Sequence, residues 1–166
     1  MPLRFETIDL AAHVELCVAF RRDSYVCSFG SDERFAEGQG AQGYIDWLRT
    51  SIEQQPRGHV HVWQGTAIIG QMEMRRLPTP PARGYVSLFY LAPEARGGGA
   101  GSALQQYAVE FLRDEGVQRA YLSVSPSNSR ALAYYQKHHW RDIGPNPRDI
   151  SCHLMELDLS ALATSY

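Results

Sequence analysis

The chain has 166 residues, of which 44% are hydrophobic and 20% are charged, and its formal net charge at pH 7 is −2. This composition is typical of a globular protein that buries one full core, and the weakly acidic balance argues against nucleic acid as the main partner. No apolar run approaches the roughly 18 residues that span a bilayer, and the N-terminus lacks the apolar stretch of a signal peptide. We therefore expect a single cytoplasmic domain over residues 1–166, with neither nucleic acid nor a membrane as partner.

The first half of the chain predicts a strand, two helices and a hairpin. Residues 3–8 alternate apolar and polar side chains, as a strand does, and Asp9 can cap a helix that runs toward Arg22. Residues 28–43 are polar and contain four glycines, which indicates a long loop. A short amphipathic helix over 44–52 and two strands over 60–64 and 67–75, joined by a turn at Gly65-Thr66, complete this half.

The second half predicts alternating strands and helices. The proline-rich segment 77–84 indicates an exposed connector, because proline cannot donate to a central ladder, and an apolar strand follows over 85–91. A glycine cluster follows, and then a helix that ends at a cap at Gly116 and has one apolar face, formed by Leu104, Tyr107, Ala108, Phe111 and Leu112. A strand over 120–124 comes next. A second helix begins after Asn128, with Ala131, Tyr134, Tyr135 and His138 on one face, and two strands near 140–144 and 151–159 end the chain. This order predicts an α/β protein with a βαβ-type core inside a mixed sheet.

The three cysteines indicate neither a disulfide framework nor a zinc site. Cys17, Cys27 and Cys152 are odd in number, widely spaced and free of any CxxC pair. This usage predicts reduced thiols that act as small buried apolar side chains, and we expect no bound metal.

The glycine cluster at residues 94–104, EARGGGAGSAL, indicates a site for an anion. A glycine loop between a strand and a helix presents bare N–H groups at the positive end of the helix dipole. The phosphate loop GxxxxGK[ST] does not fit, because no lysine follows the glycines, and the dinucleotide pattern GxGxxG also fails. The third candidate, R/QxxGxG/A, is matched by Arg96, Gly99 and Gly101.

With these residues, the sequence resembles the GCN5-related N-acetyltransferase (GNAT) superfamily, in which such a loop holds the pyrophosphate of acetyl-CoA. The run YLAPEARGGGAGSAL is similar to the family's strand end, loop and helix start, and SCHLMELDL to its last strand. The helix NSRALAYYQKHHW carries the family's spacing at Asn128, Ala131, Tyr135 and Trp140. The specific match covers about residues 84–140, and a looser one extends over 67–159. One departure is His139, where the family commonly has glycine, and histidine tolerates a positive φ better than most residues.

The resemblance implies a fold and a co-substrate. The fold is a single α/β (α+β) domain with a mixed, mostly antiparallel sheet of about seven strands and helices on both faces. The co-substrate is acetyl-CoA, with no metal. The positions that match the family's cofactor site are Phe89, Leu91, Arg96, Gly97, Gly98, Gly99, Ala100, Gly101, Ser102 and Asn128. On its own, Asn128 also fits a plain helix cap.

The resemblance also implies direct transfer of the acetyl group to a primary amine of a small molecule, peptide or protein within a ternary complex. In the family, the strand before the loop splays from its neighbour and pairs with the pantetheine arm, here near Phe89 and Leu91. The matching acid is Tyr135, although a tyrosine on an apolar helical face is by itself more often a core residue. Glu73 is the first candidate for the base, against the commoner alternative of an exposed strand glutamate, and His61 and His153 are weaker candidates.

The acceptor and the assembly stay open. Residues 20–35 are dense in polar and aromatic groups, which fits either the wall of an acceptor site or a solvated helix end. The turn 144–149 can overhang the same cleft, where Arg148 can meet an acidic group. The alternatives to an enzyme are a non-catalytic acyl-CoA sensor and, less well supported, another kind of nucleotide-binding protein. A homodimer is compatible with the sequence.

Overall fold

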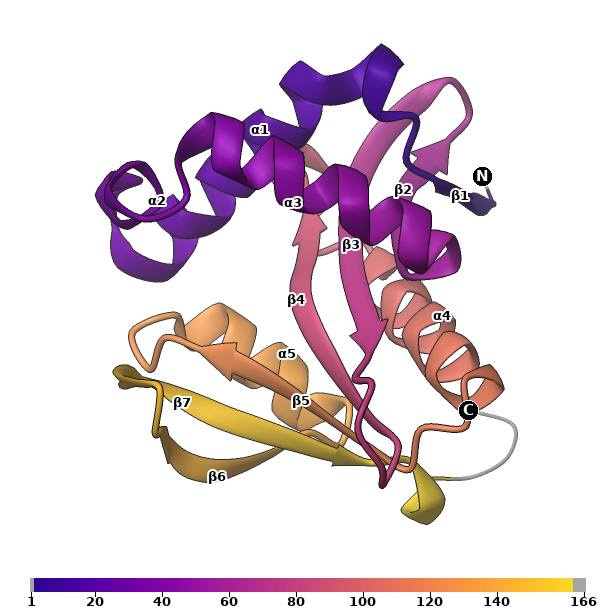
Figure 1. The fold of residues 1–166 in the computed structure, drawn as a ribbon, viewed down its shortest axis with the longest axis vertical. Helices are drawn as coiled ribbons and strands as arrows, with labels where there is room; N and C mark the ends of the chain where they lie inside the picture. Colours follow the sequence, from indigo (N-terminus) through magenta and orange to yellow (C-terminus); the bar gives the residue numbers. More distant parts are fainter. Residues whose placement is uncertain (1, 163–166) are drawn as a thin grey trace.

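A seven-stranded sheet with the order β1–β2–β3–β4–β5–β7–β6 lies at the centre of the structure (Figure 1). The computed structural model describes residues 2–162. Neighbouring strands are antiparallel except β4 and β5, which are parallel. The strands are β1 (Leu3–Thr7), β2 (His59–Gln64), β3 (Ala67–Arg76), β4 (Arg83–Leu91), β5 (Arg119–Val124), β6 (Arg141–Asn146) and β7 (Asp149–Asp158).

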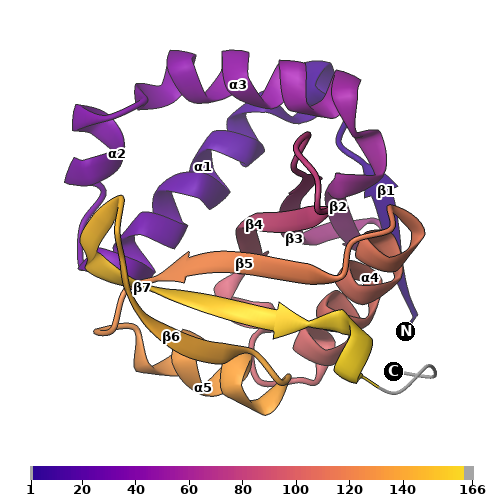
Figure 2. The ribbon, with the colours of Figure 1, turned by 60° about the horizontal axis from the view of Figure 1, so that its bottom comes forward.

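Five α-helices cover the two faces of the sheet. The helices are α1 (Leu10–Phe29), α2 (Glu33–Glu37), α3 (Gly40–Gln54), α4 (Ala100–Asp114) and α5 (Ser129–Lys137). Figure 2 shows α1 and α3 on one side of β5 and β7, and α5 on the other. Short 3₁₀ turns at Pro56–Gly58, Pro93–Ala95 and Leu159–Ala161 connect elements. The expected class, a mixed and mostly antiparallel sheet with helices on both faces, is confirmed.

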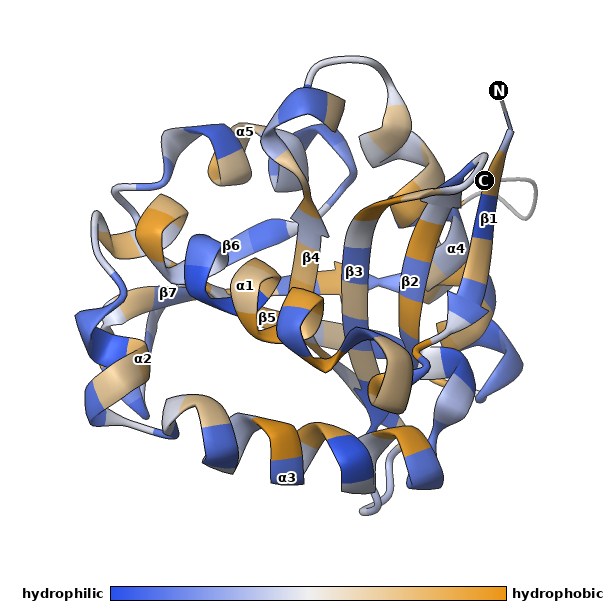
Figure 3. Cartoon of the chain, turned by 90° about the horizontal axis from the view of Figure 1, so that it is seen from above, coloured by the Kyte–Doolittle hydropathy of each residue, from blue (hydrophilic) through white to orange (hydrophobic). Residues whose placement is uncertain are grey.

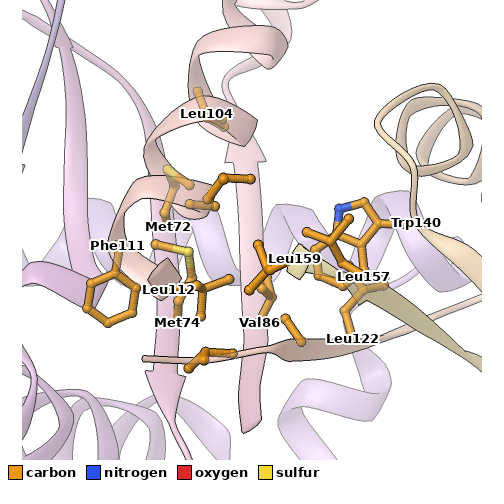
Figure 4. Close-up of a cluster of buried hydrophobic side chains, with 14 of the residues drawn as sticks. Met72, Met74, Val86, Leu104, Phe111, Leu112, Leu122, Trp140, Leu157 and Leu159 are labelled. Carbon is orange, nitrogen blue, oxygen red and sulfur yellow. The ribbon is translucent and has the colours of Figure 1, made fainter. Parts of the chain in front are cut away.

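The larger of the hydrophobic cores lies between the sheet and α4. Figure 4 shows Met72 and Met74 of β3 against Leu104, Phe111 and Leu112 of α4. Spaced three to four residues apart, the apolar side chains of α4 form one face, and that face is buried. On the other face of the sheet, smaller cores pack under α1 and α3, where hydrophilic and hydrophobic residues alternate along α3 (Figure 3).

The expectation of a long loop over residues 28–43 is wrong. Helix α1 continues past Arg22 to Phe29, α2 lies inside the segment, and α3 begins at Gly40. The reason is tertiary packing, because Phe35 of α2 is buried and packs between the rings of Tyr25 and Tyr44. One fully buried aromatic side chain thus outweighs a polar, glycine-rich local sequence.

Three local features agree with the expectations from the sequence, whereas the bounds of the last two strands differ from them. The turn at Gly65-Thr66 joins β2 and β3, Gly116 has a positive φ just after α4, and His139 holds a φ of +74° after α5. His139 therefore adopts the backbone conformation for which the family commonly uses glycine. The last hairpin is longer than expected, since β6 extends to Asn146 and β7 begins at Asp149. Pro145 is tolerated there because β6 is an edge strand.

The structure also bears on the cysteines and on membranes. All three thiols are free, and Cys17 and Cys152 are buried, whereas Cys27 is exposed on α1. Among the helices within residues 2–162, none is both long enough and apolar enough to cross a bilayer.

A glycine at the junction of α3 and β2 tests this packing. In Gly58→Ala, the added Cβ would lie 2.1 Å from the carbonyl oxygen of Met74 and 2.9 Å from the Phe111 ring. We expect this overpacking to lower the free energy of unfolding by about 1–3 kcal/mol, measured by urea denaturation. Gly43→Ala is the control, because its Cβ meets only the side chain of Gln39 at 3.6 Å in a helix that alanine favours. Equal stability of Gly58→Ala and the wild type would contradict this packing.

Candidate active site

The central feature of the site is a gap where β4 and β5 separate. The two parallel strands pair only from Arg83 to Val86 on β4, although β4 continues to Leu91. Figure 1 shows β4 turning away from β5 beyond this point. Within residues 2–162, no strand pairs with the β5-facing edge of the rest of β4. A cavity of about 410 Å³ opens along this edge, between the separating strands and the starts of α4 and α5.

The unpaired edge of β4 consists of the backbone of Phe89 and Leu91. Ala92 N–H donates to the carbonyl of Ile69 on β3, 2.8 Å away. Because the backbone groups of a strand alternate in direction, those of Tyr90 and Leu88 also face β3, and those of Phe89 and Leu91 face the gap. Both expected residues line the cavity. The Leu91 carbonyl already accepts a hydrogen bond from Arg96 Nε at 2.8 Å.

The glycine loop lies at one end of this cavity, and its backbone conformation requires two of the glycines. Gly97 has a φ of +82° and Gly99 a φ of +89°, which side chains strongly disfavour, and Gly99 caps the first turn of α4. A Cβ at Gly99 would meet nothing within 4 Å, so conformation and not space selects glycine there. Of the expected loop residues, Gly97, Gly99, Gly101 and Ser102 line the cavity, whereas Gly98 and Ala100 are not among its lining residues.

Gly101 is required for a different reason. The Tyr134 hydroxyl donates to the Gly101 carbonyl at 2.6 Å, which fastens α5 to the first turn of α4. A Cβ at Gly101 would lie 2.8 Å from the Tyr134 ring. The side chain missing at Gly101 thus makes room for a tyrosine of the protein itself.

The charges around the loop come from three elements. Arg96 lines the cavity, but its Nη2 pairs with Asp23 of α1 at 3.1 Å, and the Tyr90 hydroxyl donates to the same carboxylate. Arg130 and Lys137 of α5 also line the cavity and have exposed side chains. Neither residue was expected from the sequence, although their helix carries the motif that includes Tyr135. A basic residue in the first turn of a helix that follows a candidate cap is the signal that could have found Arg130.

Tyr135 and Asn128 both lie at the cavity wall. The Tyr135 ring packs against Phe89 and Trp140, with ring centroids 6.1 and 6.0 Å apart. Its hydroxyl makes no hydrogen bond within residues 2–162, and burial raises the pKa of the phenol, so the proton stays on the oxygen at neutral pH. Asn128 caps α5, because its side chain accepts a hydrogen bond from Ala131 N–H at 3.2 Å, as expected of a simple helix cap. It also lines the cavity.

Glu73 does not lie in this cavity. Its side chain is fully buried in the sheet face under α1 and α3 and accepts hydrogen bonds from Arg21, Tyr44 and Gln71. His61 is buried beside Gln71, and His153 pairs with Asp142 at 2.8 Å. None of these three candidate bases is a lining residue of either cavity described here.

A second cavity of about 260 Å³ adjoins the first. Both cavities are lined by Ser24, Ser28, Val86, Ser87 and Ser123. Six residues between positions 20 and 35 line the second cavity, as do Tyr85 and Asp149; these six are Arg21, Ser24, Tyr25, Ser28, Phe29 and Arg34. The polar segment on α1 and α2 is thus a cavity wall, and Asp149 of the turn 144–149 reaches it, where its carboxylate pairs with Arg34 at 2.6 Å.

Comparisons with known proteins agree with this geometry. A model described as the acetyltransferase (GNAT) family matches residues 18–140. The N-acetyltransferase PaiA from Thermoplasma acidophilum, solved in complex with coenzyme A, superposes with a TM-score of 0.77 at 16% identity over 95% of this chain and 99% of that one. YncA, a putative acetyltransferase from Salmonella typhimurium solved with acetyl-CoA, has a TM-score of 0.71 at 13% identity over 99% and 98%. At such identities, these structures show the shared fold.

Curated relatives match over a shorter stretch. Mycothiol acetyltransferase from Salinispora arenicola is 34% identical over 83 residues, which are 49% of this chain and 25% of the relative. The enzyme of the same name from Paenarthrobacter aurescens is 40% identical over 57 residues, 34% of this chain and 18% of the relative. The matches therefore span a quarter or less of these relatives. In residues 2–162, no group of three or more His, Cys, Asp or Glu side chains is placed to hold a metal ion.

Two neighbouring glycines test the reading of the loop. Gly99→Ala forces a side chain into a left-handed backbone, and we expect the free energy of unfolding to fall by about 1–2 kcal/mol. Gly98→Ala has open space and no positive φ, so its effect should stay within about 0.5 kcal/mol. Urea denaturation of both variants in the absence of ligand measures the difference. Equal losses would mean that backbone conformation is not what selects Gly99.

Proposed function

Because the chain belongs to the acetyltransferase (GNAT) family, we propose that it transfers the acetyl group of acetyl-CoA to a primary amine of a small molecule, peptide or protein. The observation that carries this proposal is the unpaired edge of β4, which lies in a cavity between the glycine loop and Tyr135. The partial likeness to mycothiol acetyltransferases supports acetyl transfer without identifying the acceptor. The three free thiols fit a reducing compartment such as the cytoplasm.

The cavity offers a distinct partner to each part of the cofactor. We propose that the start of α4 and the N–H groups from Gly97 to Gly101 hold the pyrophosphate, because they lie at the positive end of a helix. Arg130 adds positive charge next to this loop, since its Nη2 would lie 4.0 Å from a Cβ at Gly97, and Lys137 adds positive charge elsewhere in the cavity wall. The pantetheine arm then pairs with the backbone of Phe89 and Leu91 as an added strand, with Asn128 at the opposite wall.

The chemistry that follows is one direct displacement. The amine attacks the thioester carbonyl, a β4 backbone N–H on the gap side stabilises the oxyanion, and the carbon–sulfur bond breaks as the carbonyl re-forms. Tyr135 donates its proton to the leaving sulfur, a role that suits a phenol whose raised pKa keeps it protonated. We propose that the acceptor enters through the second cavity, which meets the first at Ser87.

The attacking amine must lose a proton, and the base is not assigned. An amine with a pKa of about 10.4 is neutral in only about one molecule in two thousand at pH 7. Arg21 and Arg34 in the wall of the second cavity are paired with Glu73 and Asp149, so partial desolvation in the cavity, and not an excess of positive charge, would lower the pKa of a bound amine. Water in this open cavity can then accept the proton.

The rival function is a sensor that binds acyl-CoA without catalysis. The Tyr135 hydroxyl makes no hydrogen bond to any residue within 2–162, and a protein that only binds acyl-CoA would not need a proton donor there. Tyr135 therefore favours an enzyme over a sensor. Thiol release from acetyl-CoA, followed across a panel of amines, polyamines, aminoglycosides, amino acids and N-terminal peptides, tests the proposal. We expect acceptor-dependent release with at least one class. Tight acetyl-CoA binding with no release above background for any acceptor would support the sensor instead.

Tyr135→Phe decides the role of this tyrosine. The ring contacts with Phe89 and Trp140 remain, so Tm and acetyl-CoA affinity should change little. We expect kcat to fall by about 10²–10⁴, nearer the lower end because a thiol of pKa about 8.5 leaves tolerably without help.

Tyr134→Phe is the matched comparison on the same helix. It removes the hydrogen bond to the Gly101 carbonyl, so we expect acetyl-CoA to bind about 2–10-fold more weakly while kcat at saturation is kept. All three quantities are measured on one preparation of each variant. Full kcat in Tyr135→Phe would remove this residue from the mechanism.

A further inference from the structure

One irregularity in β4 decides which of its groups face the cavity. The β3–β4 register pairs Glu73 with Leu88 and Met74 with Val86, so it skips Ser87. Ser87 is therefore a β-bulge, an extra residue in one of two paired strands. Because side chains alternate along a strand, one extra residue reverses the direction of every residue that follows.

The side chains on the two sides of the bulge show this reversal. Val86 packs in the core under α4, whereas Leu88 packs against Phe20 of α1 on the opposite face. Without the bulge, Leu88 and Tyr90 would turn toward α4 and present their backbone groups to the gap. The bulge therefore places the backbone of Phe89 and Leu91 at the cavity.

The carbonyl of the bulged residue is held by a buried ion pair. Arg21 Nη1 donates to the Ser87 carbonyl at 3.1 Å and to Glu73 Oε1 at 2.9 Å. Glu73 is the β3 residue at which the register shifts, so the ion pair lies directly over the bulge. The Arg21 side chain is 13% exposed and that of Glu73 is 0% exposed. We name these two residues the bulge clamp.

The surroundings hold the bulge clamp in one arrangement. The second oxygen of Glu73 accepts from Tyr44 and from Gln71, and the guanidinium lies over the rings of Tyr44 and Trp47 at 5.3 and 5.8 Å. Desolvating two charges is costly, so a buried ion pair contributes little net stability compared with apolar residues of similar size. A specific geometry is a better reason for its presence than stability is.

We propose that Arg21 and Glu73 are positioning residues, which hold the Ser87 bulge so that the Phe89 and Leu91 edge of β4 faces the thioester and the pantetheine arm. This inference rests on the proposed acetyl transfer. It gives Glu73 a role other than general base. This agrees with a carboxylate that lines neither cavity and already accepts hydrogen bonds from three side chains. Ser87 is one of the five residues that line both cavities.

The main test replaces the pair as a unit. Arg21→Met alone leaves a buried carboxylate unpaired, so the informative variant is Arg21→Met/Glu73→Met, with apolar side chains at both positions. We expect the double variant to stay folded and to lose about 10²-fold in kcat, the scale for a reacting group displaced by about 1 Å. Arg22→Met is the control, because Arg22 is exposed, pairs with Asp32 at 3.9 Å and does not contact Ser87. A wild-type kcat in the folded double variant would overturn the proposal.

Conservative variants separate positioning from proton transfer. Glu73→Gln keeps an oxygen that accepts from Arg21, so the bulge clamp predicts a loss below about 10-fold in kcat and an unchanged acid limb of the pH profile. A general base predicts a loss of about 10²–10⁴ and disappearance of that limb, which would overturn the proposal. Arg21→Lys keeps the charge but loses the planar guanidinium that lies over the Tyr44 and Trp47 rings, so we expect kcat between those of the wild type and the double variant.

NMR spectroscopy tests the bulge clamp without measuring activity. In ¹⁵N-labelled protein, the amide signals of Phe89 and Leu91 should shift in the double variant, both free and with coenzyme A, and should not shift in Arg22→Met. Unmoved signals would overturn the bulge clamp even if kcat fell. If the wild type itself releases no thiol with any acceptor, the proposed function fails, and the amide signals still decide whether the pair holds the bulge.

Discussion

The site depends on one constraint, which is that a buried strand must satisfy its backbone groups on both edges. β4 meets it on the β3 side along its length, but on the β5 side only as far as Val86. Beyond that residue, no strand within residues 2–162 pairs with the Phe89 and Leu91 edge, although the Leu91 carbonyl accepts from Arg96 Nε. The fold tolerates this because the edge opens into a cavity, where water or an extended ligand can satisfy it.

Helix α1 supports the unpaired part of β4 at both of its ends. At the start, Arg21 holds the Ser87 carbonyl, and at the end, Asp23 binds both the Tyr90 hydroxyl and Arg96 of the glycine loop. The two contacts come from residues two positions apart on one helix. Side chains of α1 therefore fix the part of β4 that has no strand on its β5 side. They hold its unpaired edge in place without hydrogen bonds to a second strand.

The same arrangement leaves two adjoining cavities beside β4. The larger cavity runs along the Phe89 and Leu91 edge to the loop at Gly97, while the smaller one opens between α1, α2 and β7. They meet at Ser87, the bulged residue. Under the proposed acetyl transfer, acetyl-CoA in the larger cavity and an acceptor in the smaller one would meet where β4 leaves β5.

The sequence by itself determined the features that are encoded locally. Glycines at positive φ, a helix start and the spacing from Asn128 to Tyr135 are properties of short segments, so the loop, its helix and some of the residues that line the larger cavity could be predicted, whereas Arg130 and Lys137 were not. Only the tertiary structure decided what depends on distant segments. The helical state of residues 33–37 follows from burial of Phe35, and Glu73, expected as a base, meets Arg21 from 52 residues away. The bulge at Ser87 likewise has no local signal, because a register exists only between two strands. A single sequence records backbone preference and periodicity, whereas burial, partners and register arise only when the chain has packed against itself.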